Sequence, residues 1–527
     1  MIVRPEKKKR TNTIRAVSRK RGSLIIAVVL LSCALFVAIT LKRSLVSSIP
    51  VERSYLIPWI ILVLVITLVP AVVLIKRRRF RLYNPLVYAT WSFFIPVFVF
   101  GSGYLLNGNY QPWVLNIVYD PKYYLPLALI LVAIGFVGLS IGFALPIGRQ
   151  VGLIIKEHLP RWDFGPNLLL APGVFLIIIG QGMGLVAYLQ GSYGYQYNAY
   201  EVSTLGTFFY SFFLLYYLGV FLIWFAVFRK FKFAPRHLLL ILLLISSMLF
   251  SALMGGGKGG FFNYIIIVIL AYLLAGRRPK LKQGMFITSI LVVAIIVGTI
   301  YGIGFRQRKS EQATIGLWDY IGLIGNTIQS ITQHDNSIGV GQAIQSVQER
   351  VEDLSSFAVI VSNYSRLRPL EEQYGLDNNI WTYTWTAFIP RFIWHNKPLV
   401  SDARAIGALY FGYGNNSFAI TPMGDLLRNY GPVGVLLGMA LLGLLLRIMY
   451  SALVENQSIT AGHAALYAML LSSVSYEGFY GTIVPSMMRQ GFVIIIGLFI
   501  VNTWIMLRRK SMFRNYSLRK GVSPLGQ

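Results

Sequence analysis

The chain has 527 residues, of which 55% are hydrophobic and only 13% are charged, and its net charge is +29. An ordinary soluble domain carries about 25% charged residues, so the composition excludes a water-soluble globular fold. The single cysteine, Cys33, excludes a disulfide framework and a cysteine metal cluster.

The first apolar segment follows a basic N-terminus. Residues 23–40 carry no charge and are long enough to cross a hydrocarbon core of about 30 Å at about 1.5 Å per residue. Because the run is long and lacks a small-residue cleavage site, we interpret it as a retained membrane span and not as a signal peptide.

Similar apolar segments recur to the end of the chain. They predict an all-α, polytopic membrane helix bundle of about 12 transmembrane helices. The expected spans are residues 23–41, 55–75, 84–106, 123–148, 166–190, 204–228, 237–254, 261–276, 284–304, 430–448, 461–475 and 488–507.

The lysines and arginines predict the orientation of these spans. Loops 76–81, 229–236 and 277–282 are basic, whereas loop 107–122 has one basic residue and loop 191–203 has none. Under the positive-inside rule, both termini are cytoplasmic. The basic excess then reflects topology and contact with anionic lipid, and we expect no nucleic-acid partner.

One long segment interrupts the short loops. Residues 305–429 fall on the outer side and hold 11 acidic and 10 basic residues. The chain is therefore predicted to comprise a nine-span bundle at 1–304, a large extracytoplasmic loop at 305–429 and a three-span bundle at 430–527. Apolar positions in 340–364 recur near helical spacing, which predicts a helix on the bundle or at the membrane surface.

Residues 381–398 of this loop form the first candidate site. Aromatic side chains, among them Trp385 and Trp394, surround Arg391, His395 and Lys397. Aromatic faces can bind sugar rings, and arginine offers a planar fork to phosphate. The alternative is an interfacial aromatic belt with snorkelling cations.

Arginines at the edges of the loop form a second candidate set. They are Arg306, Arg308, Arg404 and Arg428. Cations on the outer side oppose the orientation rule, so anion binding is one reason for their presence. Salt bridges are the alternative, for example from Asp402 to Arg404 and from Asp425 to Arg428.

Three ionisable residues outside the loop complete the candidates. Lys258 lies in the glycine-rich stretch 255–260, which is either an anion nest or a tight turn. Glu477 and Arg489 lie at the expected outer mouth of the last spans, and an ionisable residue at membrane depth is a functional candidate. Glu477 is a candidate base, with His395 and His334 as alternatives.

Two stretches resemble a known family. The sequence IPRFIWHNKP at 389–398 resembles the "PR-hydrophobic-W-x-x-KP" stretch in the outer loop of Wzy-type O-antigen and exopolysaccharide polymerases. Residues 412–434 resemble the family's polar stretch before a glycine-rich span. His395 departs from the pattern, in which proline is commoner, and this puts its catalytic role in doubt.

The resemblance implies a GT-C-like membrane fold and a polymerase of lipid-linked oligosaccharide repeat units at the outer face of the bacterial inner membrane. Donor and acceptor would both be carried on undecaprenyl pyrophosphate, with no metal and no cofactor. An O-antigen ligase is a close alternative, and a transporter or flippase of lipid-linked sugars is a third. The other implied partners are the bilayer and the chain-length regulator and flippase proteins of the pathway.

The candidate residues take roles on this basis. We expect Glu477, Arg391 and His395 to be catalytic. The expected substrate contacts are Arg306, Arg308, Lys397, Arg404, Arg428, Arg489, Lys258, Trp385 and Trp394.

Overall fold

The computed structural model describes most of the chain. The described residues are 53–106, 112–193, 204–229, 238–254, 258–277, 351–386, 403–414, 420–455 and 459–520, with positions 322, 325, 326, 329, 389, 394 and 418. All of the regular elements among them are helices. The elements are η1 (Ser54–Leu56), α2 (Ile57–Lys76), α3 (Pro85–Ala89), η2 (Thr90–Gly101), α4 (Ser102–Leu105), η3 (Trp113–Ile117), α5 (Pro121–Ala144), α6 (Pro146–His158), η4 (Pro166–Leu168), α7 (Leu170–Leu189), α8 (Thr204–Phe212), α9 (Leu214–Arg229), α10 (Leu238–Met254), α11 (Lys258–Leu274), α15 (Leu354–Gln373), α16 (Asn379–Thr386), α17 (Ala403–Phe411), α18 (Thr421–Leu453), α19 (Ala461–Ser472) and α20 (Tyr480–Lys520).

The helices confirm the prediction of a polytopic membrane bundle. Within the described residues, seven helical segments are long and apolar enough to cross a membrane. They are 54–76, 85–105, 121–144, 166–189, 205–229, 421–453 and 480–508. Three shorter apolar helices occupy 238–254, 262–274 and 461–472. The spans expected at 23–41 and 284–304 lie outside the described residues.

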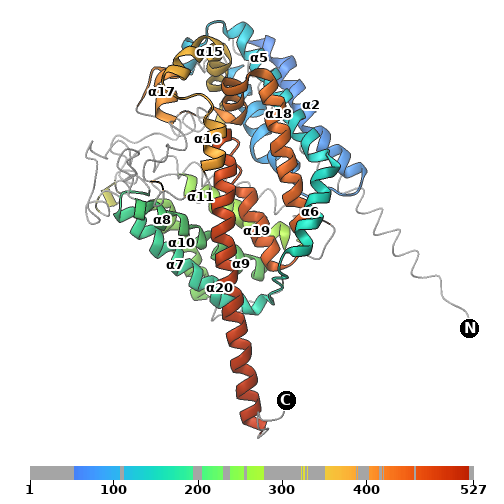
Figure 1. The fold of residues 1–527 in the computed structure, drawn as a ribbon, viewed down its shortest axis with the longest axis vertical. Coiled ribbons are helices and arrows are strands. Elements are labelled where there is room, and N and C mark those ends of the chain that lie inside the picture. Colours follow the sequence, from blue (N-terminus) through green and yellow to red (C-terminus); the bar gives the residue numbers. More distant parts are fainter. Residues whose placement is uncertain are drawn as a thin grey trace, which may run out of the picture.

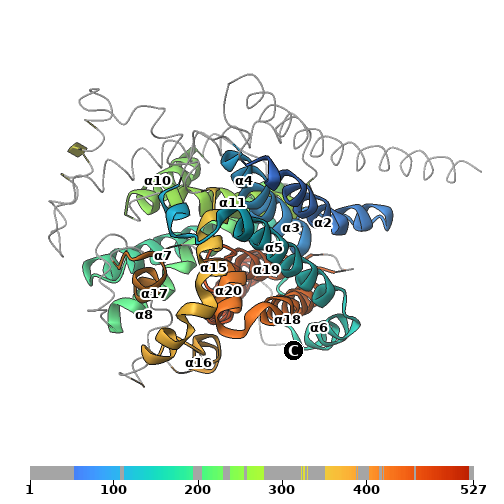
Figure 2. The same cartoon turned by 90° about the horizontal axis from the view of Figure 1, so that it is seen from above.

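Helices α15, α16 and α17 gather at one end of the bundle, which we call the upper end because Figure 1 draws it at the top. The opposite end is the lower end. Figure 1 also shows α20 running down through the molecule and continuing past the lower end. In the view from above, α5, α15, α18, α19 and α20 lie centrally, with α7, α8 and α10 to one side and α2 to the other (Figure 2).

The packing of α5 against α18 forms the main helix pair of the centre. Small residues allow their backbones to approach closely, because a Cβ atom added at Gly142 would overlap the Ala440 carbonyl and one at Gly443 would overlap that of Leu139. Small residues at helix contacts have this effect in membrane proteins, where van der Waals packing replaces the hydrophobic driving force.

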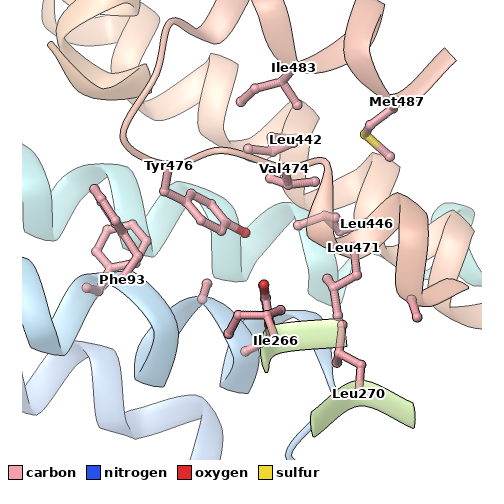
Figure 3. Close-up of a cluster of buried hydrophobic side chains, with 14 of the residues drawn as sticks. Phe93, Ile266, Leu270, Leu442, Leu446, Leu471, Val474, Tyr476, Ile483 and Met487 are labelled. Atoms are coloured by element: carbon pink, nitrogen blue, oxygen red, sulfur yellow. The ribbon is translucent and has the colours of Figure 1, made fainter. Parts of the chain in front are cut away.

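The span at 85–105 contains a different type of helix from the other described spans. Its central segment, η2, is a π-helix of 12 residues, flanked by α3 and α4. Phe93 of η2 stacks on Tyr476 at 5.7 Å between ring centroids. Figure 3 shows these two rings in a buried layer with side chains from α11, α18, α19 and α20. Helix η2 is therefore in the interior of the bundle.

Two interruptions shape the C-terminal spans. Gly431 adopts φ 70° and ψ −169° inside α18 and precedes Pro432, so α18 is kinked there. Helix α19 has only 12 residues, about 18 Å at about 1.5 Å per residue. The non-helical residues 473–479 then lead to α20. Helix α18 begins at Thr421, nine residues before the expected start of its span, so its first turns lie in the range expected to be loop.

Candidate functional site

Helix α15 anchors the upper end to the bundle. Its buried face packs against α5 and α18, and Phe357, Ile360 and Val361 are each at most 2% exposed. The helix expected in 340–364 is therefore observed from Leu354 onward, and residues 340–350 lie outside the described residues. The chain after α15 turns through residues 374–378 into α16, which packs against the first turns of α20.

A charge cluster lies buried where α15, α18 and α20 meet. We call Glu371, Asp425 and Arg428 the upper cluster. Asp425 and Arg428 face one another one helical turn apart on α18, and Arg428 Nε donates to Asp425 Oδ1 at 2.9 Å. Arg428 Nη1 donates to Glu371 Oε1 on α15 at 3.2 Å. The three side chains are at most 1% exposed.

Backbone groups complete the cluster. Arg428 Nη1 also donates to the Leu376 carbonyl at 2.9 Å, in the turn between α15 and α16. The other Asp425 oxygen, Oδ2, accepts from Gly481 N at the start of α20 at 3.0 Å. Asn429 Nδ2 donates to the Asp425 carbonyl at 2.7 Å. The guanidinium and its carboxylates thus connect three helices and one turn.

The electrostatics of the cluster follow from burial. With two carboxylates and one guanidinium, its formal charge is −1. Burial raises the pKa of Glu371 above its ordinary value, and the adjacent Arg428 opposes that rise. On α17, burial and the neighbouring Glu371 carboxylate raise the pKa of the Tyr410 hydroxyl. The expected pairing of Asp425 with Arg428 is observed, and Arg428 has no exposed surface to offer to a ligand.

An aromatic pair of one exposed and one half-buried ring involves α16. Trp385 on α16 stacks on Trp394, with ring centroids 5.8 Å apart and an angle of 28° between the planes. Trp381, one helical turn earlier, is 69% exposed, and Trp385 is 44% exposed. Two predicted substrate contacts, Trp385 and Trp394, are therefore brought together, and the exposed part of Trp385 is available to a flat apolar face of a sugar.

Glu477 and Arg404 also lie at the upper end. Glu477 is exposed in the non-helical segment 473–479, three residues before α20 begins. Arg404 is half-buried in the first turn of α17. Arg489 lies farther along α20, exposed, with its guanidinium 6.0 Å from the centroid of the Tyr210 ring.

The remaining predicted site residues are only partly placed. Lys258 is the first residue of α11. Arg391, His395, Lys397, Arg306 and Arg308 lie outside the described residues. In the described part of the chain, no group of three or more His, Cys, Asp and Glu side chains is arranged to hold a metal ion.

Sequence reasoning missed two buried carboxylates. Glu371 is separated from Arg428 by 57 positions, so no local spacing could reveal the pair. Glu352, just before α15, is 3% exposed and accepts from Ser355 N at 2.7 Å. Burial raises the pKa of Glu352 to about 7. The only available signal was the helical spacing of 340–364, which indicates a packed helix and not a buried acid.

An apolar groove of about 470 Å³ lies between α7, α10 and α20. Phe175, Ile178, Leu240 and Trp504 are among its lining residues. Because Trp504 is 24 residues beyond Tyr480 on α20, the groove is about 36 Å along the helix from the upper cluster. It is a separate feature from the candidate site.

Comparison with known proteins identifies the segment that carries the family signal. Residues 389–477 match the model of a family described as putative O-antigen polymerase. No curated protein and no solved structure matches the chain. The matched segment includes Trp394, Arg404, the α18 members of the upper cluster and Glu477. Over this segment, the match confirms that the chain resembles the Wzy-type O-antigen polymerase family.

Proposed function

We propose that this protein polymerises undecaprenyl-pyrophosphate-linked oligosaccharide repeat units into O-antigen or exopolysaccharide. The observation that carries the proposal is the family match at 389–477, because the matched segment includes α17 and the first turns of α18 at the upper end of the bundle. In this proposal the upper end faces outward from the bacterial inner membrane, and both termini are cytoplasmic. Residues 305–429 are then the extracytoplasmic part between the two groups of spans.

The proposed reaction is a glycosyl transfer between two lipid-linked substrates. A hydroxyl oxygen of the acceptor sugar attacks the anomeric carbon of the donor. A new glycosidic C–O bond forms, the bond to the pyrophosphate breaks, and the pyrophosphate leaves with the bonding electrons. A base removes the hydroxyl proton, and cationic side chains stabilise the charge on the leaving group.

The described residues support particular roles in this reaction. Glu477 is exposed, so its carboxylate is open to a substrate, whereas Glu371 and Asp425 are enclosed. We therefore retain Glu477 as the proposed base. The Trp385–Trp394 pair is proposed to bind a sugar ring.

Cations from the loop complete the proposed site. Arg391, with Lys397, Arg306, Arg308 and Arg404, is proposed to contact the diphosphate. Arginine suits this role because its planar fork can form two parallel hydrogen bonds to phosphate oxygens.

Deletion of the encoding gene, followed by analysis of the surface glycan, tests the function. We expect lipid carrying one repeat unit to accumulate, and a plasmid copy to restore polymer. Long polymer that is not transferred to its final acceptor would instead identify an O-antigen ligase. Normal glycan with altered uptake would contradict both enzymes and favour a transporter.

Arg391→Ala tests the site in the same strain. We expect polymer to disappear while the protein remains in the membrane. Arg368→Ala is the matched control, because Arg368 is an exposed cation on α15 whose partner is the exposed Glu372. Full-length polymer from Arg391→Ala would remove Arg391 from the site. Glu477→Gln should also abolish polymer, and an active variant would exclude Glu477 as the base.

A further inference from the structure

We propose that Arg428 is a positioning residue, which fixes α16 and its exposed tryptophans relative to the bundle. The proposal rests on the proposed function, since it concerns the same upper end. It assigns Arg428 a different role from the substrate contact expected from the sequence. The side chain is 0% exposed and is engaged by Glu371, Asp425 and the Leu376 carbonyl.

We call the place where the start of α16 meets the start of α20, at Ile380 and Gly481, the joint. Arg428 is connected to both sides of it. On one side, its Nη1 holds the Leu376 carbonyl, three residues before α16 begins. On the other side, Asp425 binds Gly481 N at the start of α20 through Oδ2, the oxygen that does not face the Arg428 Nε. Arg428 and Asp425 therefore connect the entrance of α16 to the entrance of α20.

The two helices touch at the same place. A Cβ atom added at Gly481 would lie 3.2 Å from both the Ile380 Cα and a ring carbon of Tyr383. Position 481 therefore accommodates glycine, and a larger residue there would require its neighbours on α16 to shift. Ile380 and Trp385 lie on the same helix of eight residues. A movement at the joint would therefore carry the tryptophan pair with it.

The chemistry of the guanidinium indicates that Arg428 does more than stabilise the fold: it fixes the orientation of its partners. Well-packed apolar residues can often replace a buried ion pair without loss of stability. A guanidinium differs from an apolar group because its planar donors fix the directions of several partners at once. In active sites, a displacement of about 1 Å can reduce rates on the order of 100-fold.

The first test measures the joint without reference to activity. With Cys33 replaced by serine, Ile380→Cys provides a single thiol at a position that is 7% exposed. Its labelling by a membrane-impermeant maleimide should become several-fold faster when Arg428→Lys or Glu371→Gln is added. Arg447→Lys is the control, because Arg447 lies on the same helix but pairs with Glu455. Unchanged labelling in both upper-cluster variants would overturn the proposal.

The second test asks whether a covalent link can replace the cluster. Cysteines at positions 481 and 380 are near enough to be linked by a disulfide once the neighbours of the added Cβ at 481 shift by a few tenths of an ångström. We expect Arg428→Lys to lower polymer synthesis at least about tenfold, as expected for a displaced site. When the disulfide between positions 380 and 481 is formed, Arg428→Lys should make as much polymer as the disulfide-linked protein that retains Arg428, which is the linked parent. Reduction of the disulfide should lower polymer synthesis by the variant again.

The outcomes separate positioning from direct contact. Failure of a formed disulfide to rescue Arg428→Lys, in a parent that is active when linked, would overturn the positioning role of Arg428. If the linked parent is inactive, the labelling rates decide the proposal by themselves. The labelling rates also test the positioning role if the protein makes no polymer. An error in the proposed function can therefore be distinguished from an error in the positioning role of Arg428.

Discussion

Two charge clusters lie at opposite ends of α18. The upper cluster has one arginine and two carboxylates, all at most 1% exposed. The lower cluster consists of Arg149, Arg447 and Glu455, with side-chain exposures of 46%, 14% and 9%. In the lower cluster, Arg447 Nη2 lies 3.0 Å from Glu455 Oε2, and Ser451 Oγ donates to the same oxygen at 3.0 Å.

The two clusters differ in their access to solvent. When Glu455 loses Arg447, it keeps Ser451 and Arg149 as partners, and Arg149 is open to water or a lipid headgroup. The upper cluster has no such access, so each charge depends on the other two and on the backbone groups of Leu376 and Gly481. The upper end is therefore expected to be more sensitive to substitution than the lower end.

The largest predicted effect is that of Arg428→Met. This change leaves Glu371 and Asp425 buried without their cation, and breaking a buried pair in this way destabilises a protein by about 3–5 kcal/mol. Arg447→Met, at the lower cluster, should reduce stability by only about 1–2 kcal/mol. Thermal unfolding in detergent, with both variants in the same background, measures the difference. Equal losses would contradict the comparison.

Glu352→Gln is predicted to have the next largest effect, in the opposite direction. Burial of Glu352 outweighs the opposing charge of Arg53 and raises its pKa from 4.5 to about 7. Because the folded-state pKa is the higher one, folding is most favourable at low pH. Stability is lost as pH rises from about 4.5 to about 7, by on the order of 3 kcal/mol.

Glu352→Gln should abolish this pH dependence and raise the unfolding temperature above pH 7. Unfolding temperatures measured from pH 5 to pH 8 check the prediction. Glu372→Gln is the control, because the Glu372 side chain is 55% exposed. A wild-type protein whose stability does not fall over this range would show that the Glu352 carboxyl is not enclosed.

Gly431→Ala tests the kink that separates the two ends of α18. The backbone angles of Gly431 lie in a region accessible almost only to glycine, so alanine should destabilise the fold by about 1–3 kcal/mol. Gly182→Ala is the control, because Gly182 is in a regular part of α7 with nothing within 4 Å of an added Cβ. It should be neutral or stabilising. A stable Gly431→Ala protein would mean that the kink is not required.

The sequence was sufficient to predict the class of fold but not the joints within it. Hydropathy identified the long spans because lipid imposes an apolar composition on about 20 consecutive residues. The expected start of this span, at 430, coincides with the kink at Gly431, and the sequence did not predict the helical turns before it, which carry Asp425 and Arg428. Their charges are tolerated within the helix because they pair with one another and with Glu371.

The candidate site was predictable only where its residues are near in sequence. Trp385 and Trp394 are both among the aromatic residues predicted for one site, and their rings stack. The salt bridge from Asp425 to Arg428 followed from their spacing of three. The contacts of Arg428 with Glu371 and of Asp425 with Gly481 depend on how distant helices pack. No periodicity within one segment encodes those contacts.

The smallest predicted effect is that of Arg368→Ala. Arg368 and Glu372 form an ion pair on α15 with 3.2 Å between Nε and Oε1, but their side chains are 60% and 55% exposed. Exposed pairs at this helical spacing contribute about 0.3–0.5 kcal/mol, so the unfolding temperature should barely change. The pair is one position from the buried Glu371, which makes it a strict control for burial. If Arg368→Ala lowered stability as much as Arg428→Met, proximity to the joint, and not desolvation of the charges, would determine how strongly substitutions at the upper end destabilise the protein.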